Sequence, residues 1–186
     1  MVNHIIEPKI NSLELAYETG FHIGDATMTF RKRKNEYCVT YYGNNKTERN
    51  FFEEVIAPLL NKLYNLKVKV KNFKNTCYIR IYSKELVEFK SKVIGLPIGS
   101  KASLISLPEI ITSKGLDYIS HLIAGIFDSD GTVKIVHKNG RLYPTLNITL
   151  KNREIIDQIK EILASLGITT TRYKETRYDK RVNKFT

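Results

Sequence analysis

Two aspartates, Asp25 and Asp130, each follow a stretch of apolar and small residues. Asp130 comes after the run IAGIFDS at 123–129, and Asp25 comes after a degenerate copy, ETGFHIG, at 18–24. The same offset of 105 positions relates both copies, as expected of one module that occurs twice. Paired carboxylates are well suited to binding a divalent cation. The two acids are therefore the first candidates for chemistry.

Small residues spaced four apart indicate how the acids are positioned. Gly20 and Gly24 share one helix face, as do Gly125 and Ser129. Faces this small allow two helix backbones to approach closely, and apolar neighbours would fill both sides of the contact. Such packing places the terminal acids side by side, and Gly131 suits a left-handed residue that closes a helix. The alternative is a helical hairpin with solvated terminal acids, which two acids in register disfavour.

The stretch Ile123 to Gly131 resembles the LAGLIDADG motif of homing endonucleases. Gly20 to Asp25 resembles the weaker first copy of single-chain members that have two repeats, with Ala26 in place of the family glycine. The segment from Gly95 to Lys101, continuing to Leu107-Pro108-Glu109, is similar to the connection between repeats in archaeal-type members. The resemblance covers nearly the whole chain.

This resemblance implies that Asp25 and Asp130 are metal-binding catalytic acids, with the carbonyl oxygens of Gly24 and Ser129 completing the metal shell. We expect Mg²⁺, for which Mn²⁺ or Ca²⁺ would substitute, because hard oxygen ligands suit it. Lys46 and Lys151 each lie near the start of a module's second helix, where family members often carry a residue that orders water or steadies the phosphate. Both fit solvated lysines equally well. We interpret Asp128 first as a helix-end or hydrogen-bonding residue.

The sequence predicts an α+β fold of two pseudo-symmetric αββαββα modules, with saddle-shaped antiparallel sheets over a two-helix interface. The domains are a first repeat at 1–94, a connection at 95–117 and a second repeat at 118–186 that is incomplete at its C-terminus. The predicted helices span 12–25, 47–64, 84–93, 118–130 and 153–166. The predicted strands span 27–34, 37–42, 66–72, 77–83, 132–138, 142–150 and 169–177.

Several predicted strands alternate apolar residues with basic or polar ones, as in LKVKVK at 66–71. Such a strand has one basic face, and basic sheets can lie in the major groove of DNA. An ordinary solvated sheet face is the simpler alternative. The candidate DNA-contacting residues are Arg31, Arg33, Lys67, Lys69, Lys71, Tyr78, Arg80, Tyr82, Lys134, Arg141, Asn147, Thr149, Arg172 and Lys174.

Composition is consistent with a polyanionic partner. The 186 residues carry 30 Lys and Arg against 19 Asp and Glu, a net charge of +11. No apolar run reaches the length of a membrane span, the N-terminus lacks a signal-peptide pattern, and Cys38 and Cys77 lack metal-ligand spacing. The absence of a targeting pattern leads us to expect a cytoplasmic protein. The resemblance implies a monomeric endonuclease that cuts a long asymmetric site in double-stranded DNA and promotes intron homing. The alternatives are an RNA-binding splicing maturase without nuclease activity and a basic structural protein of a ribonucleoprotein.

Overall fold

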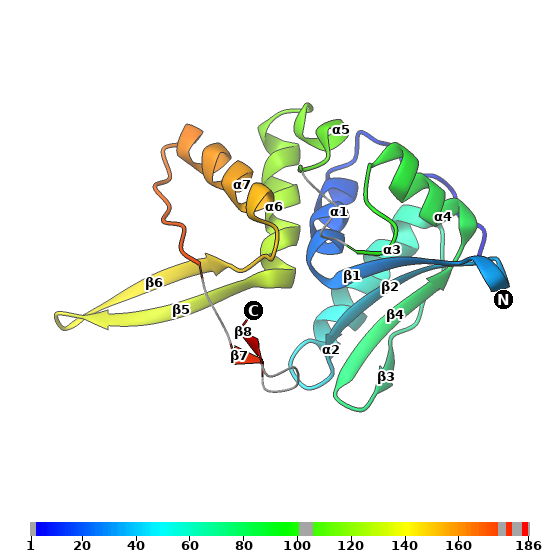
Figure 1. Ribbon diagram of the computed structural model, residues 1–186, viewed down its shortest axis with the longest axis horizontal. Coiled ribbons are helices and arrows are strands. Elements are labelled where there is room, and N and C mark those ends of the chain that lie inside the picture. The colour runs from blue at the N-terminus through cyan, green and yellow to red at the C-terminus, as the bar shows by residue number, and fades with distance from the viewer. Residues whose placement is uncertain (1–2, 101–105, 175–177, 180–183, 186) are drawn as a thin grey trace.

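The computed structural model describes residues 3–100, 106–174, 178–179 and 184–185. Two helices, α1 (Leu13–Asp25) and α6 (Leu116–Asp130), lie side by side at the centre of the molecule. A sheet extends to either side from the lower ends of this pair (Figure 1). This arrangement is the predicted α+β architecture.

Each central helix passes directly into a strand without a loop. The hydroxyl of Ser12 caps α1 by accepting a hydrogen bond from the Leu15 amide. At its other end α1 continues into β1 (Ala26–Arg31), just as α6 continues into β5 (Gly131–Lys138). Ala26 (φ −108°, ψ 162°) and Gly131 (φ −89°, ψ 162°) have the same extended conformation. The expectation that Gly131 closes its helix in a left-handed conformation was therefore wrong.

The first repeat contains a four-stranded antiparallel sheet in the order β1-β2-β4-β3, with β2 at Glu36–Asn44, β3 at Lys71–Phe73 and β4 at Thr76–Tyr82. Alternation sorts its side chains as predicted, because Met28, Val39 and Ile79 are at most 1% exposed on one face. Two predicted strands were too long. The strand predicted at 27–34 gives way to a 3₁₀ turn at Lys32–Lys34, and the strand predicted at 66–72 begins only at Lys71.

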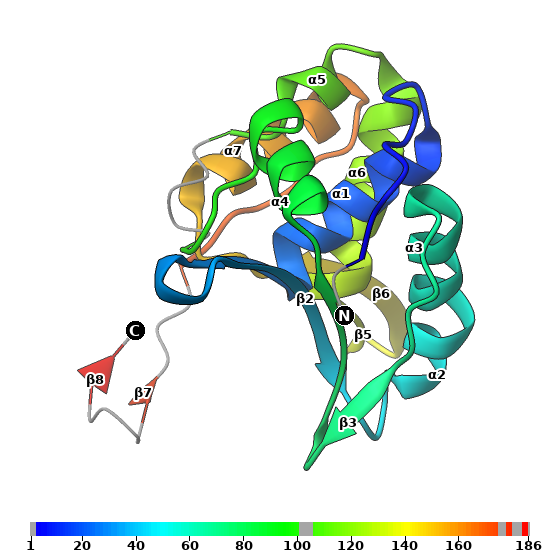
Figure 2. The same ribbon diagram turned by 90° about the vertical axis from the view of Figure 1, so that its right-hand side faces the viewer.

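Helices cover the apolar face of this sheet (Figure 2). One continuous helix comprises α2 (Arg49–Phe51), a π-helical segment (Phe52–Ile56) and α3 (Ala57–Tyr64). A second comprises α4 (Lys84–Glu88) and a π-helical segment (Phe89–Val93), and the hydroxyl of Ser83 caps it by accepting from the Leu86 amide. The result is the predicted αββαββα order in the first repeat.

The second repeat is less complete. It consists of α6, the hairpin β5–β6 (β6 at Arg141–Ile148) and α7 (Arg153–Ser165), and the short α5 (Glu109–Thr112) precedes it. The strand predicted at 169–177 is absent from the described residues 169–174, and residues 175–177 lie outside the described ranges. A separate two-stranded ladder joins β7 (Tyr178–Asp179) to β8 (Lys184–Phe185).

The β5–β6 hairpin exposes an apolar face whose counterpart in the first repeat is buried. Met28 pairs with Val39 two residues along β1, and Val133 pairs with Leu146 at the same place on β5. Met28 and Val39 are 1% and 0% exposed, whereas Val133 and Leu146 are 61% and 67% exposed. The second sheet consists of only two strands, and its outer half packs on no helix of the described chain.

Both cysteines are buried free thiols, as expected. Within the described ranges, we find no helix with the length and apolar character needed to cross a bilayer.

Candidate active site

The two motif helices touch through their glycines, as the spacing predicted. A Cβ atom added to Gly125 would lie 2.0 Å from the main-chain oxygen of Tyr17, and one added to Gly20 would lie 1.9 Å from that of Leu122. Real Cβ atoms do not approach so closely, and a helix backbone cannot easily move aside. Glycine is therefore required at both positions.

The same contact continues to the helix ends, where the acids lie. A Cβ atom on Gly24 would lie 1.9 Å from Oγ of Ser129 and 3.0 Å from Oδ2 of Asp130. The Ser129 hydroxyl turns back onto its own helix and donates to the carbonyls of Gly125 and Ile126, at 3.1 and 2.9 Å. The Asp130 carboxylate thus lies against the residue that precedes Asp25, which brings the two predicted acids to one place.

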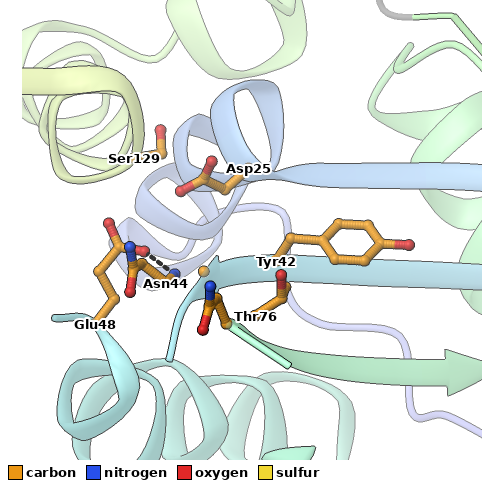
Figure 3. A pocket seen from close by; sticks show the side chains of 8 residues that line it. Asp25, Tyr42, Asn44, Glu48, Thr76 and Ser129 are labelled. Atoms are coloured by element: carbon orange, nitrogen blue, oxygen red, sulfur yellow. Dashed lines mark hydrogen bonds between the residues drawn. The ribbon is translucent and has the colours of Figure 1, made fainter. Parts of the chain in front are cut away.

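Asp25 also borders an open pocket of about 470 Å³ at the foot of the first repeat. Ser129 contributes from the partner helix, and the other lining residues come from the ends of β2 and β4 and from the start of α2 (Figure 3). Those residues are Tyr42, Gly43, Asn44, Glu48, Asn75 and Thr76. Glu48 accepts a hydrogen bond from the backbone amide of Asn44. The pocket therefore joins the helix interface to the polar face of the sheet.

Our sequence reasoning missed these lining residues. Tyr42 and Asn44 follow Thr40 by alternation, so they belong to the polar face of β2, and the sheet register pairs them with Tyr78 and Thr76. The alternation signal was present in the sequence, but it was applied to β4 and not to β2. The position of Glu48 depends on the turn that links β2 to α2, for which the sequence carried no comparable signal.

The two candidate lysines lie where predicted, each just before the second helix of its module. Lys46 and Lys151 are both exposed. The backbone amide of Lys46 donates to Oδ1 of Asn44 at 2.9 Å, so the Asn44 side chain helps to fix the turn beside the pocket. Lys46 is not one of the residues that line the pocket. A catalytic role for either lysine stays a prediction.

Candidate DNA-contacting residues of the first repeat share one polar face. Arg80 lies between Tyr78 and Tyr82 on β4, donates from Nε to Oγ1 of Thr40 at 3.3 Å, and stacks 5.2 Å above the Tyr78 ring. Arg31 ends β1 on the same face and forms an ion pair with Glu36. Arg33 lies in the 3₁₀ turn beyond. The exposed lysines Lys67 and Lys69 alternate with packed neighbours, although they precede the strand that contains Lys71.

The candidate DNA-contacting residues of the second repeat are arranged less regularly. Thr132, Lys134 and Val136 of β5 face the same side as their β6 partners, so Lys134, Asn147 and Arg141 share one face, and Thr149 follows just past the strand. Arg172 instead binds Asp157 of α7, with its Nη1 2.6 Å from Oδ1. Because no strand forms at 169–174, the alternating arrangement predicted for Arg172 and Lys174 was wrong.

The donor set fits a hard divalent cation that retains water. Asp25 and Asp130 each end a helix, where the helix dipole makes the local electrostatic potential more negative. This potential favours a bound cation. Among the described residues no three His, Cys, Asp or Glu side chains group together, so the protein supplies few ligands. Magnesium is typically bound through one or two carboxylates, with water and substrate phosphate completing its shell, whereas structural zinc takes four protein ligands.

One family model matches the second half of the chain. It is described as a LAGLIDADG-like domain, and the match covers residues 117–184. This segment is therefore similar to a LAGLIDADG-like domain. The matched region contains α6, the β5–β6 hairpin and α7, together with the catalytic candidate Asp130.

Solved structures of a homing endonuclease share the fold of most of the chain. Variants of the homing endonuclease I-DmoI superpose with a TM-score of 0.60 over 94% of this chain and 86% of theirs, at 20% sequence identity. I-DmoI in complex with DNA and Mn gives a TM-score of 0.59 over 94% and 87%, also at 20% identity. The chain therefore has the fold of this endonuclease.

Curated relatives are much longer proteins. The RNA polymerase subunit Rpo1C of Methanocaldococcus jannaschii is 26% identical over 183 residues, which is 93% of this chain and 19% of the relative. The helicase Hel308 of the same organism is 29% identical over 165 residues (87% and 12%), and a Bacillus subtilis ribonucleoside-diphosphate reductase subunit, NrdEB, is 24% identical over 182 (91% and 16%). The chain thus spans less than a fifth of each.

Proposed function

We propose that this protein is a site-specific homing endonuclease that hydrolyses phosphodiesters in double-stranded DNA with a divalent metal ion. The observation that carries the proposal is the convergence of Asp25 and Asp130 at the glycine contact of two helices. A nuclease that cuts both strands needs an acid for each strand, and a pseudo-twofold interface supplies one from each repeat. The fold shared with DNA-bound I-DmoI supports the same conclusion.

In this mechanism the main role of the protein is to position the DNA and the metal ion. The sheets hold the duplex by its phosphates and groove edges, so that one scissile phosphate meets Asp25 and the other Asp130. Two carboxylates at helix C-termini would repel a phosphate, which makes a cation between them necessary. A bound Mg²⁺, or Mn²⁺ or Ca²⁺ in its place, would supply an activated water and charge stabilisation. Lys46 and Lys151 are candidates to steady the phosphate from outside the pair.

The distribution of the known relatives supports the proposal that this chain is encoded by a mobile sequence. An RNA polymerase subunit, a helicase and a reductase have unrelated activities, yet each matches 87% or more of this chain over a small part of its own length. A segment with such a distribution is a module that its hosts do not need for their own reactions. Endonuclease-driven insertion accounts for this distribution, and intron homing is the form that we propose here.

Plasmid cleavage tests the proposal directly. The substrate is a plasmid carrying the DNA that flanks the encoding gene, joined across the insertion point and compared with the same plasmid bearing a scrambled junction. We expect linearisation of the first plasmid with Mg²⁺ and none with EDTA. Asp25→Asn and Asp130→Asn should each abolish double-strand cleavage but retain binding in an electrophoretic assay. Full double-strand cutting by both variants would refute the assignment of the acids.

The RNA-binding maturase remains the second candidate, because basic sheets would serve it equally well. It predicts that the purified protein promotes splicing of its own intron transcript in vitro and leaves the junction plasmid intact in Mg²⁺. A monomer acting on DNA predicts the reverse, with one protein per duplex in light scattering.

A further inference from the structure

The contact between α1 and α6 is not symmetric. The offset that relates the repeats maps Tyr17 onto Leu122 and Asp128 onto Ile23. Leu122 and Ile23 are buried apolar residues, 0% and 6% exposed. On the other side of the interface, the Tyr17 hydroxyl donates to Oδ2 of Asp128 at 2.6 Å. One side of the pseudo-twofold axis thus has a polar bond where the other has only packing.

Tyr17 contacts α6 at two levels. Its carbonyl oxygen lies against Gly125, at the closest approach of the helices, and its hydroxyl holds Asp128, three residues further along. These contacts hold α6 from Gly125 to Asp128, two residues before the terminal Asp130. Burial, followed by the bond to Asp128, raises the pKa of Tyr17, so the hydroxyl keeps its proton and remains the donor.

We propose that Tyr17 is a positioning residue for Asp130, acting through Asp128, and that it governs cleavage of one DNA strand and not the other. The role rests on the proposed endonuclease function. Tyr17 belongs to the first repeat, whereas the acid that it positions belongs to the second. The residues at the pseudo-symmetric positions, Ile23 and Leu122, are buried and apolar, so their side chains cannot form the corresponding hydrogen bond. The two acids are therefore supported by different kinds of side-chain contact, a hydrogen bond in one case and apolar residues in the other.

The experiment measures the two strands separately. A duplex of the junction sequence, labelled with a different dye on each strand, is cut under single-turnover conditions in Mg²⁺. Asp130→Asn first identifies the strand that depends on the second acid. Tyr17→Phe, which removes only the hydroxyl, should slow that same strand about tenfold, the effect of roughly 1.4 kcal/mol, with the other strand changed less than twofold. Nicked duplex should accumulate accordingly.

Three further variants separate positioning from general damage. Asp128→Ala, which removes the acceptor of the Tyr17 hydroxyl, should slow the same strand, and the double variant Tyr17→Phe/Asp128→Ala should be no slower than the more affected single variant, because both substitutions remove the same bond. Tyr118→Phe, on α6 but outside this contact, should cut both strands at the original rates. Binding affinity should not change in any of these variants.

The outcomes distinguish the two proposals. If the unsubstituted protein cuts, and Tyr17→Phe slows both strands equally or slows the strand governed by Asp25, the positioning role is refuted and the endonuclease stands. If the unsubstituted protein cuts neither strand of its junction duplex, the proposed function fails, and the positioning role fails with it.

Discussion

Glu18 is a charged residue in the middle of the first repeat's core. It is 1% exposed, and Lys90, itself 0% exposed, donates to both of its carboxylate oxygens at 2.6 and 2.7 Å. The hydroxyls of Tyr41 and Tyr64 donate to the same carboxylate. Burial lowers the pKa of Lys90, which the charge of Glu18 opposes. Every acceptor of the carboxylate is satisfied, so the pair ties α1 to the π-helical segment that follows α4.

Removing the lysine from this pair should be costly. Lys90→Met leaves the Glu18 carboxylate buried without its cation, and we expect a loss of about 3–5 kcal/mol in unfolding free energy by urea titration. Lys92→Met, on the same segment but at an exposed ion pair with Glu88, is the matched control. It should lower the free energy of unfolding far less, because solvent screens this exposed pair. Equal losses in both variants would mean that the buried pair contributes nothing special.

A surface pair predicts a pH dependence. The bond from Lys62, with help from the backbone and Ser12, lowers the pKa of Glu14 to about 2. A carboxyl whose pKa is lower in the folded protein stabilises the fold at pH values above its ordinary pKa of 4.5. This stabilisation is lost as the pH falls from 4.5 towards 2. Glu14→Gln should therefore lower stability at pH 6, by roughly 0.5 kcal/mol because solvent screens the pair, and match the unsubstituted protein near pH 2. Urea titrations at both pH values check it.

At the scale of the elements, the glycine contact decides how α1 and α6 cross. Both close approaches are to main-chain oxygens, which cannot rotate away as a flexible side chain would. The two sheets continue directly from the ends of these helices. Separation of the helices would therefore move both the acids and the DNA-facing surfaces.

A methyl group at the contact should uncouple cleavage from binding. Gly125→Ala places its Cβ where only 2.0 Å is available, so the helices must shift at a cost of about 1–3 kcal/mol. We expect the cleavage rate to fall more than the DNA affinity, and Gly125→Leu to lose the fold. Ala124→Leu adds side-chain bulk at the adjacent exposed position and should change neither. Matched thermal melts and cleavage rates decide this, and a fully active, equally stable Gly125→Leu would contradict it.

Because the second sheet has only two strands, lysine substitutions at equivalent positions of the two sheets should have very different effects on stability. Leu146 is 67% exposed, so Leu146→Lys should change stability by less than about 0.5 kcal/mol. Val39→Lys, its counterpart in the first repeat, would bury a charge and unfold that repeat. Ile148→Lys should fall between them, because Ile148 packs partly against the core. Thermal melts of the three variants test the order, and a large loss for Leu146→Lys would show that this face is covered in solution.

Local patterns predicted most of these elements, and long-range contacts explain the rest. The spacing of Gly20 and Gly125 predicted the helix contact because small residues at four-residue intervals define a helix face. Strand alternation identified the buried faces without knowledge of the partner strand. The sequence could not predict the partnership of Glu18 with Lys90, which lie 72 residues apart. Nor could it predict that no strand forms at residues 169–174, because strand formation depends on an available neighbour.

At the scale of the whole molecule, charge governs the approach to DNA. The net charge of +11 favours any polyanion, and sequence specificity must come from groove contacts on the two polar faces. The two sheets extend to opposite sides of the helix pair, so a duplex that crossed both would pass beneath the ends of these helices (Figure 1). Every phosphate contact would release counterions.

Salt titration should count these contacts. Lys69→Ala removes an exposed positive charge beside the polar face of the first sheet, so the slope of log affinity against log salt should decrease by about 0.9. Lys62→Ala removes an equally exposed charge from α3, on the covered side of that sheet. Its slope should be unchanged. Equal slopes for both variants would mean that Lys69 does not face the DNA.

The glycine contact has one more consequence, for how such a molecule can be assembled. Where two helices meet through main-chain atoms, the closest approach is set by the backbone of each partner and not by long side chains. Any repeat with small residues at the same two positions allows the same close approach. The Tyr17–Asp128 bond and the buried side chains beside the glycines, such as Leu122 and Ile126, would have to be kept as well. New pairs of half-site preferences could then arise by exchanging one repeat while these few residues are retained.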